Sequence, residues 1–324
     1  MRKFLKPSLL SAALALTLAL GAAPLTSHAA EAVPAAQTDA AVRQGRAPSE
    51  RARAAGPPPA AAATPDAGQT VAVPSTAAVP SVSVSLQGKK VSILGDSIST
   101  FTGTMPADYN IYYPESGDIP NAGQTWWGQL LTNTGMVLCR NASSANTDVT
   151  GNSLALDGSA PGCSIRRVMD LRGTDGSSPD VIIIYMGIND FARSRTLGSF
   201  RSPGVQTEGE VMVFTDAYEL MLQKIKALYP AASIYCCTLL ERCDVNGNTG
   251  APAVNLNGDT VADFNTQIKA IAKAYGASVI DFYNCGINYT NLDLFTVDGV
   301  HPTWLATGVL SQCATQAVLA SAGV

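Results

Sequence analysis

The stretch VIIIYMGIND, residues 181–190, decides the fold class of this chain. Its first six residues are apolar without interruption and rich in β-branched side chains. Such a run is typical of a strand that is covered on both faces, as strands are in parallel sheets between layers of helices. The run then turns at Gly187 and reaches Asn189, so a polar side chain is expected where this strand ends.

The same alternation of strands and helices continues on both sides of that stretch. Apolar runs between turn residues predict four more strands, over residues 90–94, 136–139, 233–239 and 278–282. Helical spacing predicts helices over residues 124–134, 165–171, 210–228, 260–275 and 304–320. Strand followed by helix five times predicts an α/β fold with a mainly parallel five-stranded sheet. The active residues of such sheets lie at the carboxyl ends of the strands.

The part before residue 88 has a different composition. Residues 1–29 have a basic start, a short apolar core and a small-residue cleavage site, which predicts a secretory signal peptide. The apolar core is too short to cross a bilayer, so no transmembrane segment is expected after cleavage. Residues 30–87, rich in Ala and Pro, are predicted to be a disordered linker. Residues 88–324 have the length of one α/β domain.

Charge and cysteine content narrow the partners and the compartment. Loss of the signal peptide would remove three basic residues and no acidic ones, lowering the formal net charge from −4 to −7. That charge argues against nucleic acid or an anionic membrane as a partner. No cysteine lies near the cleavage site, so we expect a secreted protein without a lipid anchor.

The chain has seven cysteines, all after residue 88: Cys139, Cys163, Cys236, Cys237, Cys243, Cys285 and Cys313. In an exported protein some of them are expected to form disulfides, and the odd number leaves at least one without a partner in the same chain. Cys236 or Cys237 with Cys243 would close a short loop. The pairing itself cannot be read from the sequence.

Histidine is scarce enough to restrict the chemistry. The chain has two histidines, and His28 would leave with the signal peptide. Any imidazole base must therefore be His301, and no site with several histidine ligands for a metal is possible. Asp298 precedes it by three residues, in DGVH. Two interpretations are open: Asp298 orients the imidazole for catalysis, or Asp298 caps the last helix and His301 is a surface residue.

Two more polar residues follow predicted strands. VSILGDSIST, residues 91–100, is an apolar strand that breaks into Gly, Asp and Ser97. A serine at a strand end can serve as a nucleophile, and the Asn189 carboxamide can donate to an oxyanion. Taken alone, each motif is equally well explained as ordinary turn chemistry. No phosphate-binding glycine loop or dinucleotide fingerprint appears, and we expect no cofactor.

In combination, these blocks resemble the SGNH (GDSL) hydrolase superfamily over residues 88–324. The resemblance implies a three-layer, flavodoxin-like α/β/α fold that hydrolyses esters. By position it implies that Ser97 is the nucleophile and, through its own N–H, one oxyanion donor. It further implies that Asn189 is a second donor, and that Asp298 and His301 are the acid and the base of a triad.

One block departs from the family pattern. The family has a glycine after the second strand whose N–H completes the oxyanion hole, whereas this chain reads CRNASSANTDVTG over residues 139–151. The best-placed residue is Ala145, which we predict as the third donor. Alanine restricts the dihedral angles that glycine would allow.

The loop after Ser97 and the start of the next helix carry candidate substrate-binding aromatics. These are Tyr109, Tyr112, Tyr113 and Trp126, whose faces could stack on a sugar ring or hold an acyl chain. Packing in the core is the alternative explanation for each. Several polar loops at the catalytic edge suit an O-acetylated carbohydrate better than a deep lipid tunnel.

Three functions are therefore compatible with the sequence. The first is a secreted serine esterase that removes acetyl or other short acyl groups, with a small-molecule or glycan ester as substrate and no metal. The second is a lipolytic esterase or lysophospholipase on the same triad. The third is a surface-binding module with weak catalysis or none.

Overall fold

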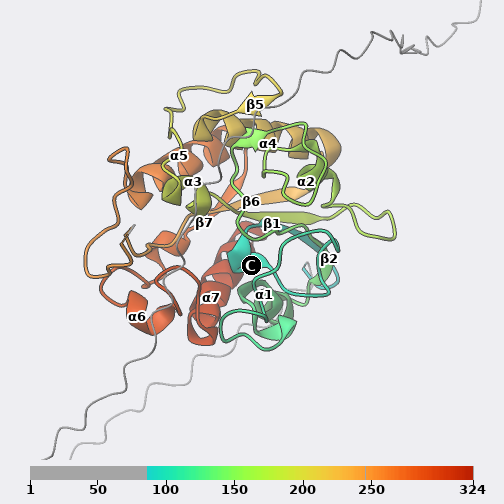
Figure 1. Ribbon diagram of the computed structural model, residues 1–324. Coiled ribbons are helices and arrows are strands. Elements are labelled where there is room, and N and C mark those ends of the chain that lie inside the picture. Colours follow the sequence, from blue (N-terminus) through green and yellow to red (C-terminus); the bar gives the residue numbers. More distant parts are fainter. Residues whose placement is uncertain (1–85, 245, 324) are drawn as a thin grey trace, which may run out of the picture. The chain divides into compact units, whose positions relative to one another are not determined.

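The computed structural model describes residues 86–244 and 246–323 (Figure 1). The predicted signal peptide lies outside these residues, as does the predicted linker except for its last two positions. Within the described part of the chain, no helix has both the length and the apolarity needed to span a bilayer.

Five parallel strands form the central sheet, in the order β2-β1-β4-β6-β7. They are β1 (Lys90–Gly95), β2 (Val137–Asn141), β4 (Val181–Tyr185), β6 (Ser233–Cys237) and β7 (Ser278–Ile280). Each of the five predicted strands is present, and the differences are confined to the strand ends. The predicted α/β class with a parallel five-stranded sheet is confirmed.

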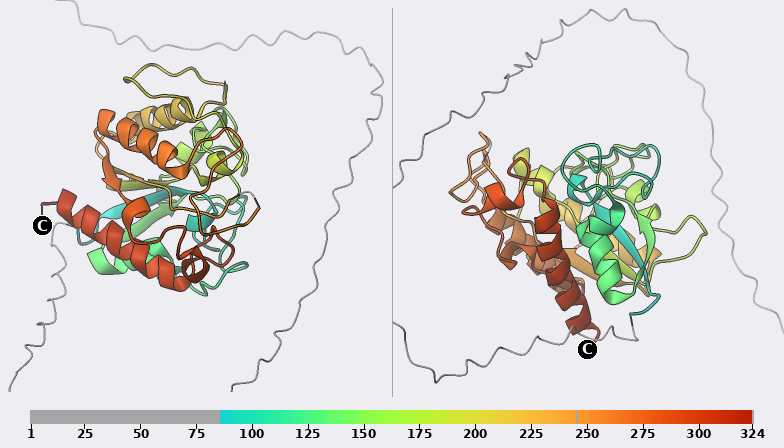
Figure 2. Two further views of the ribbon diagram at one scale, coloured as in Figure 1. Left: turned by 90° about the vertical axis from the view of Figure 1, so that its left-hand side faces the viewer. Right: turned by 90° about the horizontal axis from the view of Figure 1, so that it is seen from below.

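Helices cover both faces of this sheet. On one face lie α1 (Trp126–Thr134) and α7 (Trp304–Ser321), which pack against each other. On the other face lie α2 (Ile165–Met169), α4 (Phe214–Leu228) and α5 (Val261–Ala274), as the views in Figures 1 and 2 show. Two short helices, α3 (Ile188–Ala192) and α6 (Leu292–Phe295), lie in the connections. The arrangement is the expected three-layer α/β/α sandwich.

The central strand β4 accounts for this architecture. All five of its residues are buried, and it pairs with β1 on one side and β6 on the other. Complete burial of an isoleucine side chain contributes about 1.5–3 kcal/mol, and Ile182, Ile183 and Ile184 are all completely buried. Beyond the strand, Gly187 has φ +126°, a conformation that L side chains rarely adopt, and from there the chain enters α3.

One predicted helix begins too early. Residues 210–228 were expected to be helical throughout, but Glu210–Val211 forms β5, which pairs antiparallel with β3 (Gly151–Asn152). The helix α4 begins only at Phe214. Exposed Glu210 beside buried Val211 has the alternation of a strand. The two-residue partner strand is too short to be recognised from the sequence.

The short loop closure that Cys236 or Cys237 could have made with Cys243 is not present. All seven cysteines are free thiols in the structure. Cys236 and Cys237 are completely buried in β6, and burial raises the pKa of the Cys236 thiol to about 12. Cys243 instead packs against the loop before α7, where its N–H donates to the Gly299 carbonyl at 2.8 Å.

The order of the strands places a crevice at the carboxyl end of β1. From β1 the chain passes to β2 on one side, and it later returns to β4 on the other side. In open parallel sheets, ligands bind where the connections diverge in this way. Ser97 lies two residues beyond the end of β1, at that point.

Candidate active site

A tight turn carries Ser97 directly after β1. The Asp96 carboxylate accepts the Ile98 N–H at 3.1 Å and so caps the short 3-10 helix Ser97–Ser99. A Cβ at Gly95 would lie 2.6 Å from the Ser99 Cβ and 2.7 Å from the Ser143 Oγ, so only glycine lets the turn close. Burial raises the pKa of Asp96 to about 6, although the hydrogen bond from Ile98 opposes the shift.

Ser97, His301 and Asp298 form a continuous hydrogen-bonded chain. The Ser97 Oγ lies 2.9 Å from His301 Nε2, and His301 Nδ1 lies 2.7 Å from Asp298 Oδ2. The other oxygen of Asp298 accepts the backbone N–H groups of Val300 at 3.0 Å and His301 at 2.8 Å. The loop 298–301 is therefore folded around its own carboxylate.

This geometry decides between the two interpretations of Asp298. The helix α7 is capped by Thr303, whose hydroxyl accepts the Ala306 N–H, so Asp298 is not its cap. The His301 side chain is only 16% exposed, which does not fit a free surface residue. Asp298 is therefore placed as a hydrogen-bond partner of the imidazole and not as a helix cap.

Asp298 is ionised at neutral pH. Burial by itself would raise the pKa of this carboxyl group, but the hydrogen bonds from the side chain and backbone of His301 outweigh it and lower the pKa to about 2. A carboxylate at Nδ1 favours the tautomer that carries its proton there. In that tautomer the lone pair of Nε2 faces the Ser97 hydroxyl.

The tyrosines of the loop after Ser97 hold this arrangement instead of presenting open faces. The Tyr112 ring stacks on the His301 ring, with 3.6 Å between centroids and 11° between planes, and its hydroxyl donates to Asp298 at 3.4 Å. Tyr113 is completely buried and donates to the Pro302 carbonyl at 2.9 Å. The prediction that Tyr113 binds substrate is therefore wrong, and one face of Tyr112 is already occupied by His301.

Tyr109 and Trp126 are corrected in the same way. Tyr109 is 4% exposed and donates its hydroxyl to Asp170 at 2.7 Å. Trp126 is completely buried and donates its indole N–H to the Ser99 Oγ at 3.1 Å. Tyr109, in the loop, is thus tied to Asp170 at the end of α2, and Trp126, at the start of α1, is tied to the turn that carries Ser97. Neither can stack on a substrate.

Two donors suited to an oxyanion lie near Ser97. The Ser97 N–H has no hydrogen-bond partner among residues 86–244 and 246–323. Asn189 stands in the first turn of α3, half-buried, and one hydrogen of its Nδ2 is donated to the Thr147 carbonyl at 3.1 Å. A carboxamide nitrogen carries two hydrogens, so the second is available to a ligand.

The prediction that Ala145 is the third donor is not supported, because its N–H is already used. It donates to the Asn110 carbonyl at 2.9 Å. The next residue, Asn146, is exposed and has φ +63°, and its N–H makes no hydrogen bond to any part of the chain that the structure describes. Asn is one of the few residues other than glycine that enter this left-handed region readily. That preference could have indicated Asn146 from the sequence.

Arg167 is a buried arginine that no sequence motif indicated, and it connects the loop 142–150 to β1. Arg167 is completely buried, and its guanidinium donates to four acceptors: Gly95 O at 2.5 Å, Ala142 O at 2.9 Å, Thr147 Oγ1 at 3.0 Å and Ala160 O at 3.0 Å. Burial lowers the pKa of Arg167 to about 10, so the group remains charged at neutral pH. Arg167 therefore anchors both the segment before Ser97 and the loop that carries Thr147, whose carbonyl accepts the Asn189 carboxamide.

Asp190 anchors the same loop from α3. It is completely buried and accepts the N–H groups of Val149 at 2.7 Å and Thr150 at 3.0 Å. Burial, together with the nearby Asp148 carboxylate, raises the pKa of Asp190. Asp148 in turn pairs with Arg193, and with Arg195 at 2.9 Å. Charged groups thus surround the loop on the side away from β1.

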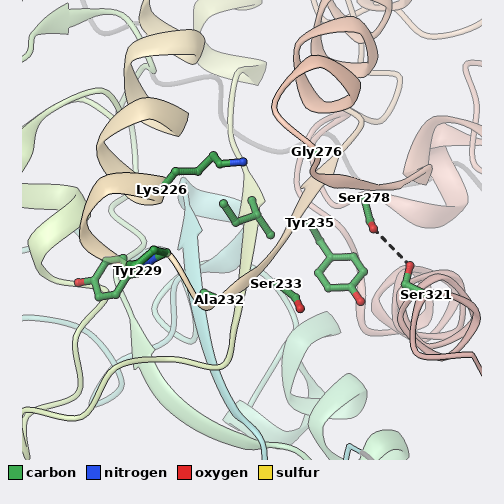
Figure 3. Close-up of a pocket in the computed structure, with 10 residues that line it drawn as sticks. Lys226, Tyr229, Ala232, Ser233, Tyr235, Gly276, Ser278 and Ser321 are labelled. Atoms are coloured by element: carbon green, nitrogen blue, oxygen red, sulfur yellow. Dashed lines mark hydrogen bonds between the residues drawn. The ribbon is translucent and has the colours of Figure 1, made fainter.

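Two cavities differ in their position relative to this site: one adjoins it and the other lies at the opposite edge of the sheet. A cavity of about 260 Å³ adjoins the loop and is lined by polar side chains that include Asn146, Thr147, Asp148, Ser159 and Arg195. A second cavity, of about 290 Å³, opens at the amino ends of β6 and β7, where Ser278 and Ser321 are hydrogen-bonded (Figure 3). The second lies at the sheet edge opposite Ser97 and takes no part in the chemistry described here.

The described part of the chain contains no group of three or more His, Cys, Asp or Glu side chains that could hold a metal ion. The segment after Cys243 forms a turn. There the Asp244 carboxylate accepts the N–H groups of Asn246 and Asn248, each at 2.8 Å.

A serine, a histidine and an aspartate linked by hydrogen bonds at the carboxyl edge of a parallel sheet are the arrangement of serine-dependent hydrolases. The chain belongs to the GDSL-like lipase/acylhydrolase family, whose model matches residues 89–285. Esterases and lipases make up this family, so the protein is a hydrolase of that kind. The match includes Ser97 and Asn189, whereas Asp298 and His301 lie beyond it.

Solved structures of similar proteins agree with this assignment. A Bacteroides uniformis protein classed with the GDSL-like lipases is 26% identical, with a TM-score of 0.52, and the match covers 72% of this chain and 96% of that one. A Bacteroides ovatus protein of the same class is 25% identical, with a TM-score of 0.52 and coverage of 71% and 97%. A Lactobacillus plantarum protein, 17% identical with a TM-score of 0.54 over 72% and 98%, shares the fold. No curated protein sequence matches the chain.

Proposed function

We propose that this protein is an exported serine esterase that removes acetyl or other short acyl groups from carbohydrate. The observation that carries the proposal is the unbroken chain of hydrogen bonds from Ser97 through His301 to Asp298. Each link has the length and the order that nucleophilic catalysis by serine requires. Export rests on the composition of residues 1–29, outside the described residues.

The proposed reaction has two balanced halves. His301 Nε2 takes the proton of Ser97 as the Oγ attacks the ester carbonyl, and Asp298 stabilises the imidazolium that forms. The tetrahedral intermediate collapses, the C–O bond to the leaving alcohol breaks, and the alcohol takes the proton from His301. Water then attacks the acyl-enzyme with His301 again as base, which releases the carboxylic acid and restores Ser97.

We assign the oxyanion hole to three N–H donors. These are the backbone N–H of Ser97, the free hydrogen of the Asn189 carboxamide and the backbone N–H of Asn146. The contact from Asn189 to the Thr147 carbonyl brings the carboxamide beside the segment that follows Asn146. Donors held in place before the reaction stabilise the developing charge without reorganisation at that moment.

The surroundings favour a polar substrate with a short acyl group. The aromatic side chains that could have walled an acyl tunnel, Tyr109, Tyr113 and Trp126, are turned into the core. The cavity next to Asn146 is lined instead by hydroxyl, amide and charged groups. Such a lining can satisfy the hydroxyl groups of a sugar, whereas a lipid tail would leave these groups unpaired.

Covalent labelling tests the nucleophile. A fluorophosphonate should label the protein at Ser97, as mapped by mass spectrometry. Ser97→Ala should abolish the labelling and lower hydrolysis of p-nitrophenyl acetate by at least about 10⁴-fold. Ser143→Ala is the matched control, because the Ser143 hydroxyl is buried at the same edge without a hydrogen-bond partner among the described residues.

Several outcomes would contradict the proposal. If the parent protein is neither labelled nor active on any ester, the surface-binding module becomes the better explanation. If activity rises steadily from acetyl to octanoyl and longer esters, the lipolytic alternative is favoured. If Ser97→Ala remains active, the assignment of the nucleophile is wrong.

A further inference from the structure

A groove of about 470 Å³ runs along the surface between α1 and α7. Its lining includes Gln124, Gln129, Trp304, Leu305, Gly308 and Gln312. The volume is in the range of pockets that hold small ligands. None of the described residues that line the groove is charged. The groove is therefore neutral, although the chain as a whole carries a net negative charge.

Trp304 is the unusual residue of this groove. The chain has three tryptophans, and the other two, Trp126 and Trp127, are 0% and 2% exposed. Trp304 is 59% exposed, and its neighbour Leu305 is 39% exposed. A large aromatic face left in water beside a second apolar side chain is typical of a surface that binds something.

Unpaired amide groups surround this aromatic face. Gln129 is held in place by its Nε2, which donates to the Thr307 hydroxyl at 3.1 Å and to the Gln124 carbonyl at 3.0 Å. Its Oε1 accepts no hydrogen bond within residues 86–244 and 246–323, and neither the amide of Gln312 nor the Nε2 of Gln124 has a partner there. The groove thus offers uncharged hydrogen-bond acceptors and donors. One of them, the Gln129 side chain, is held in place by its own hydrogen bonds.

Gly308 keeps the floor of the groove open. It lies inside α7, where glycine costs about 1 kcal/mol relative to alanine. Close packing does not require it, because a Cβ added there would find its nearest neighbour, Gln129 Oε1, at 3.7 Å, an ordinary contact. Its lack of a side chain leaves room beside Trp304 that a bulky side chain such as leucine would fill.

The groove is near the catalytic residues. Trp304 follows His301 by three residues, so their Cα atoms are at most about 11 Å apart. The Trp304 N–H donates to Asp118 at 3.0 Å, which ties the mouth of the groove to the same loop that stacks Tyr112 on His301. The groove therefore begins beside the loop that carries His301, one member of the triad.

We propose that this groove is a binding subsite for an uncharged sugar ring, with Trp304 as its stacking platform and the glutamines as hydrogen-bonding partners. The inference deepens the proposed function and rests on it: the ester cleaved at Ser97 would be carried by an oligosaccharide or polysaccharide whose neighbouring sugar occupies the groove. A lipid tail would not pair with the free amides, and an anionic polymer would find no cation in the lining.

Binding is measured first, on Ser97→Ala protein, so that hydrolysis does not interfere. The probes are xylohexaose and cellohexaose, followed by tryptophan fluorescence and by calorimetry. Saturable binding of one of them is expected, with a change in fluorescence, because Trp304 is the exposed tryptophan. Trp304→Ala should weaken binding by at least about tenfold, as loss of a central aromatic contact does. Trp304→Tyr should retain most of it.

Two further variants separate the groove from the fold. Gly308→Leu should block binding by filling the floor while leaving Trp304 in place. Gly308→Ala should bind nearly as the parent does and raise the thermal midpoint slightly. In the enzyme with Ser97 intact, Trp304→Ala should raise KM for acetylated xylan by about tenfold or more. The same variant is also assayed on p-nitrophenyl acetate: an equal loss on both esters would indicate damage to the triad, whereas a loss on acetylated xylan alone is expected of a sugar subsite.

The outcomes distinguish this inference from the proposed function. Binding that depends on Trp304, in a protein that hydrolyses no ester, would keep the subsite and refute the esterase. Hydrolysis of p-nitrophenyl acetate without binding of either hexasaccharide, or with an unchanged KM for acetylated xylan in Trp304→Ala, would overturn the subsite and leave the esterase. Self-association that Trp304→Ala abolishes, measured by sedimentation, would also overturn it, because the groove would then be covered by a second copy.

Discussion

The two halves of the candidate site are built in different ways. The catalytic chain is made of side chains from short segments: Asp298 and His301 are three residues apart, and their side chains are 45% and 16% exposed. The proposed oxyanion side combines the Ser97 N–H and the Asn189 carboxamide with the Asn146 N–H, which comes from the loop between residues 142 and 150. That loop is held by two completely buried ionisable side chains, Arg167 from α2 and Asp190 from α3.

The two halves of the site therefore keep their shape by different means. The loop 298–301 is closed by hydrogen bonds within four residues, so it carries most of its order with it. The loop 142–150 has one short internal hydrogen bond, from the Thr147 hydroxyl to the Ser144 carbonyl at 2.7 Å, and otherwise depends on side chains from helices elsewhere in the sequence. Damage to the first half should therefore change chemistry alone, whereas damage to the anchors of the second should change chemistry and stability together.

Asp298→Asn should have the largest effect on the rate. The amide cannot stabilise the imidazolium and favours the wrong tautomer of His301, so kcat should fall by about 10³- to 10⁴-fold with little change in KM. The measurement is steady-state hydrolysis of p-nitrophenyl acetate, with Asp293→Asn as control. Because Asp298 is partly exposed, the urea midpoint should change little. An unchanged kcat would mean that Asp298 has no part in the chemistry.

Asn189→Ala tests the side-chain donor of the oxyanion hole. Loss of one such donor should lower kcat by about 10²- to 10³-fold while KM stays nearly constant. Asn133→Ala, on α1, provides a comparison outside the site. A rise in KM at constant kcat would instead indicate that Asn189 binds the ground state of the substrate.

Arg167→Met should affect both rate and stability. Four acceptors would lose their donor, and each unsatisfied buried group costs about 1–3 kcal/mol, so the free energy of unfolding should drop by at least about 3 kcal/mol. In the protein that remains folded, kcat should fall by roughly tenfold, because the loop that presents the oxyanion donors loses its anchor.

The neighbouring Arg166→Met is the matched control for Arg167. Arg166 lies on the same helix but pairs at the surface with Asp108 and Asp170. Its loss should cost about 1 kcal/mol or less. Urea denaturation and kcat, measured on both variants, give the comparison. Equal effects of the two changes would refute the anchoring role of Arg167.

The smallest effects are expected at the loop backbone itself. Asn146→Gly keeps the N–H and accepts the left-handed conformation, so kcat should stay within about threefold, as it should in Ala145→Gly. Asn146→Val places a β-branched residue at a φ of +63°, which costs about 1–3 kcal/mol and should displace the N–H. Of these three variants, only Asn146→Val is expected to lower kcat, by about tenfold. If Asn146→Val behaves like Asn146→Gly, Asn146 is not an oxyanion donor.

Local chemistry explains what could be predicted from the sequence. The run 181–186 requires burial on both faces, whatever surrounds it, and so indicates a parallel sheet. Ser97 and Asn189 follow strands directly, and Asp298 lies within reach of His301 along the chain. These are relations between near neighbours or between strand ends, and period and spacing are enough to find them.

Only the tertiary structure decided the relations between distant segments. For Tyr109 and Trp126 the sequence left both packing and substrate binding open. In the structure, Tyr109 in the loop after Ser97 and Trp126 at the start of α1 both turn inward. The N–H of Ala145 was lost to Asn110 because the loop 101–121 crosses it.

Arg167 and Trp304 both show that the residue type alone does not predict whether a position is buried or exposed. A charged residue in a helical pattern reads as a surface residue, yet Arg167 is completely buried against four acceptors from other segments. A tryptophan reads as a core residue, yet Trp304 stands in solvent beside α1. Sequence by itself determined the sheet, because the sheet depends on local period, and through the family resemblance it predicted the reactive side chains. Burial and exposure at single positions depend on which segments meet there, and folding alone decides that.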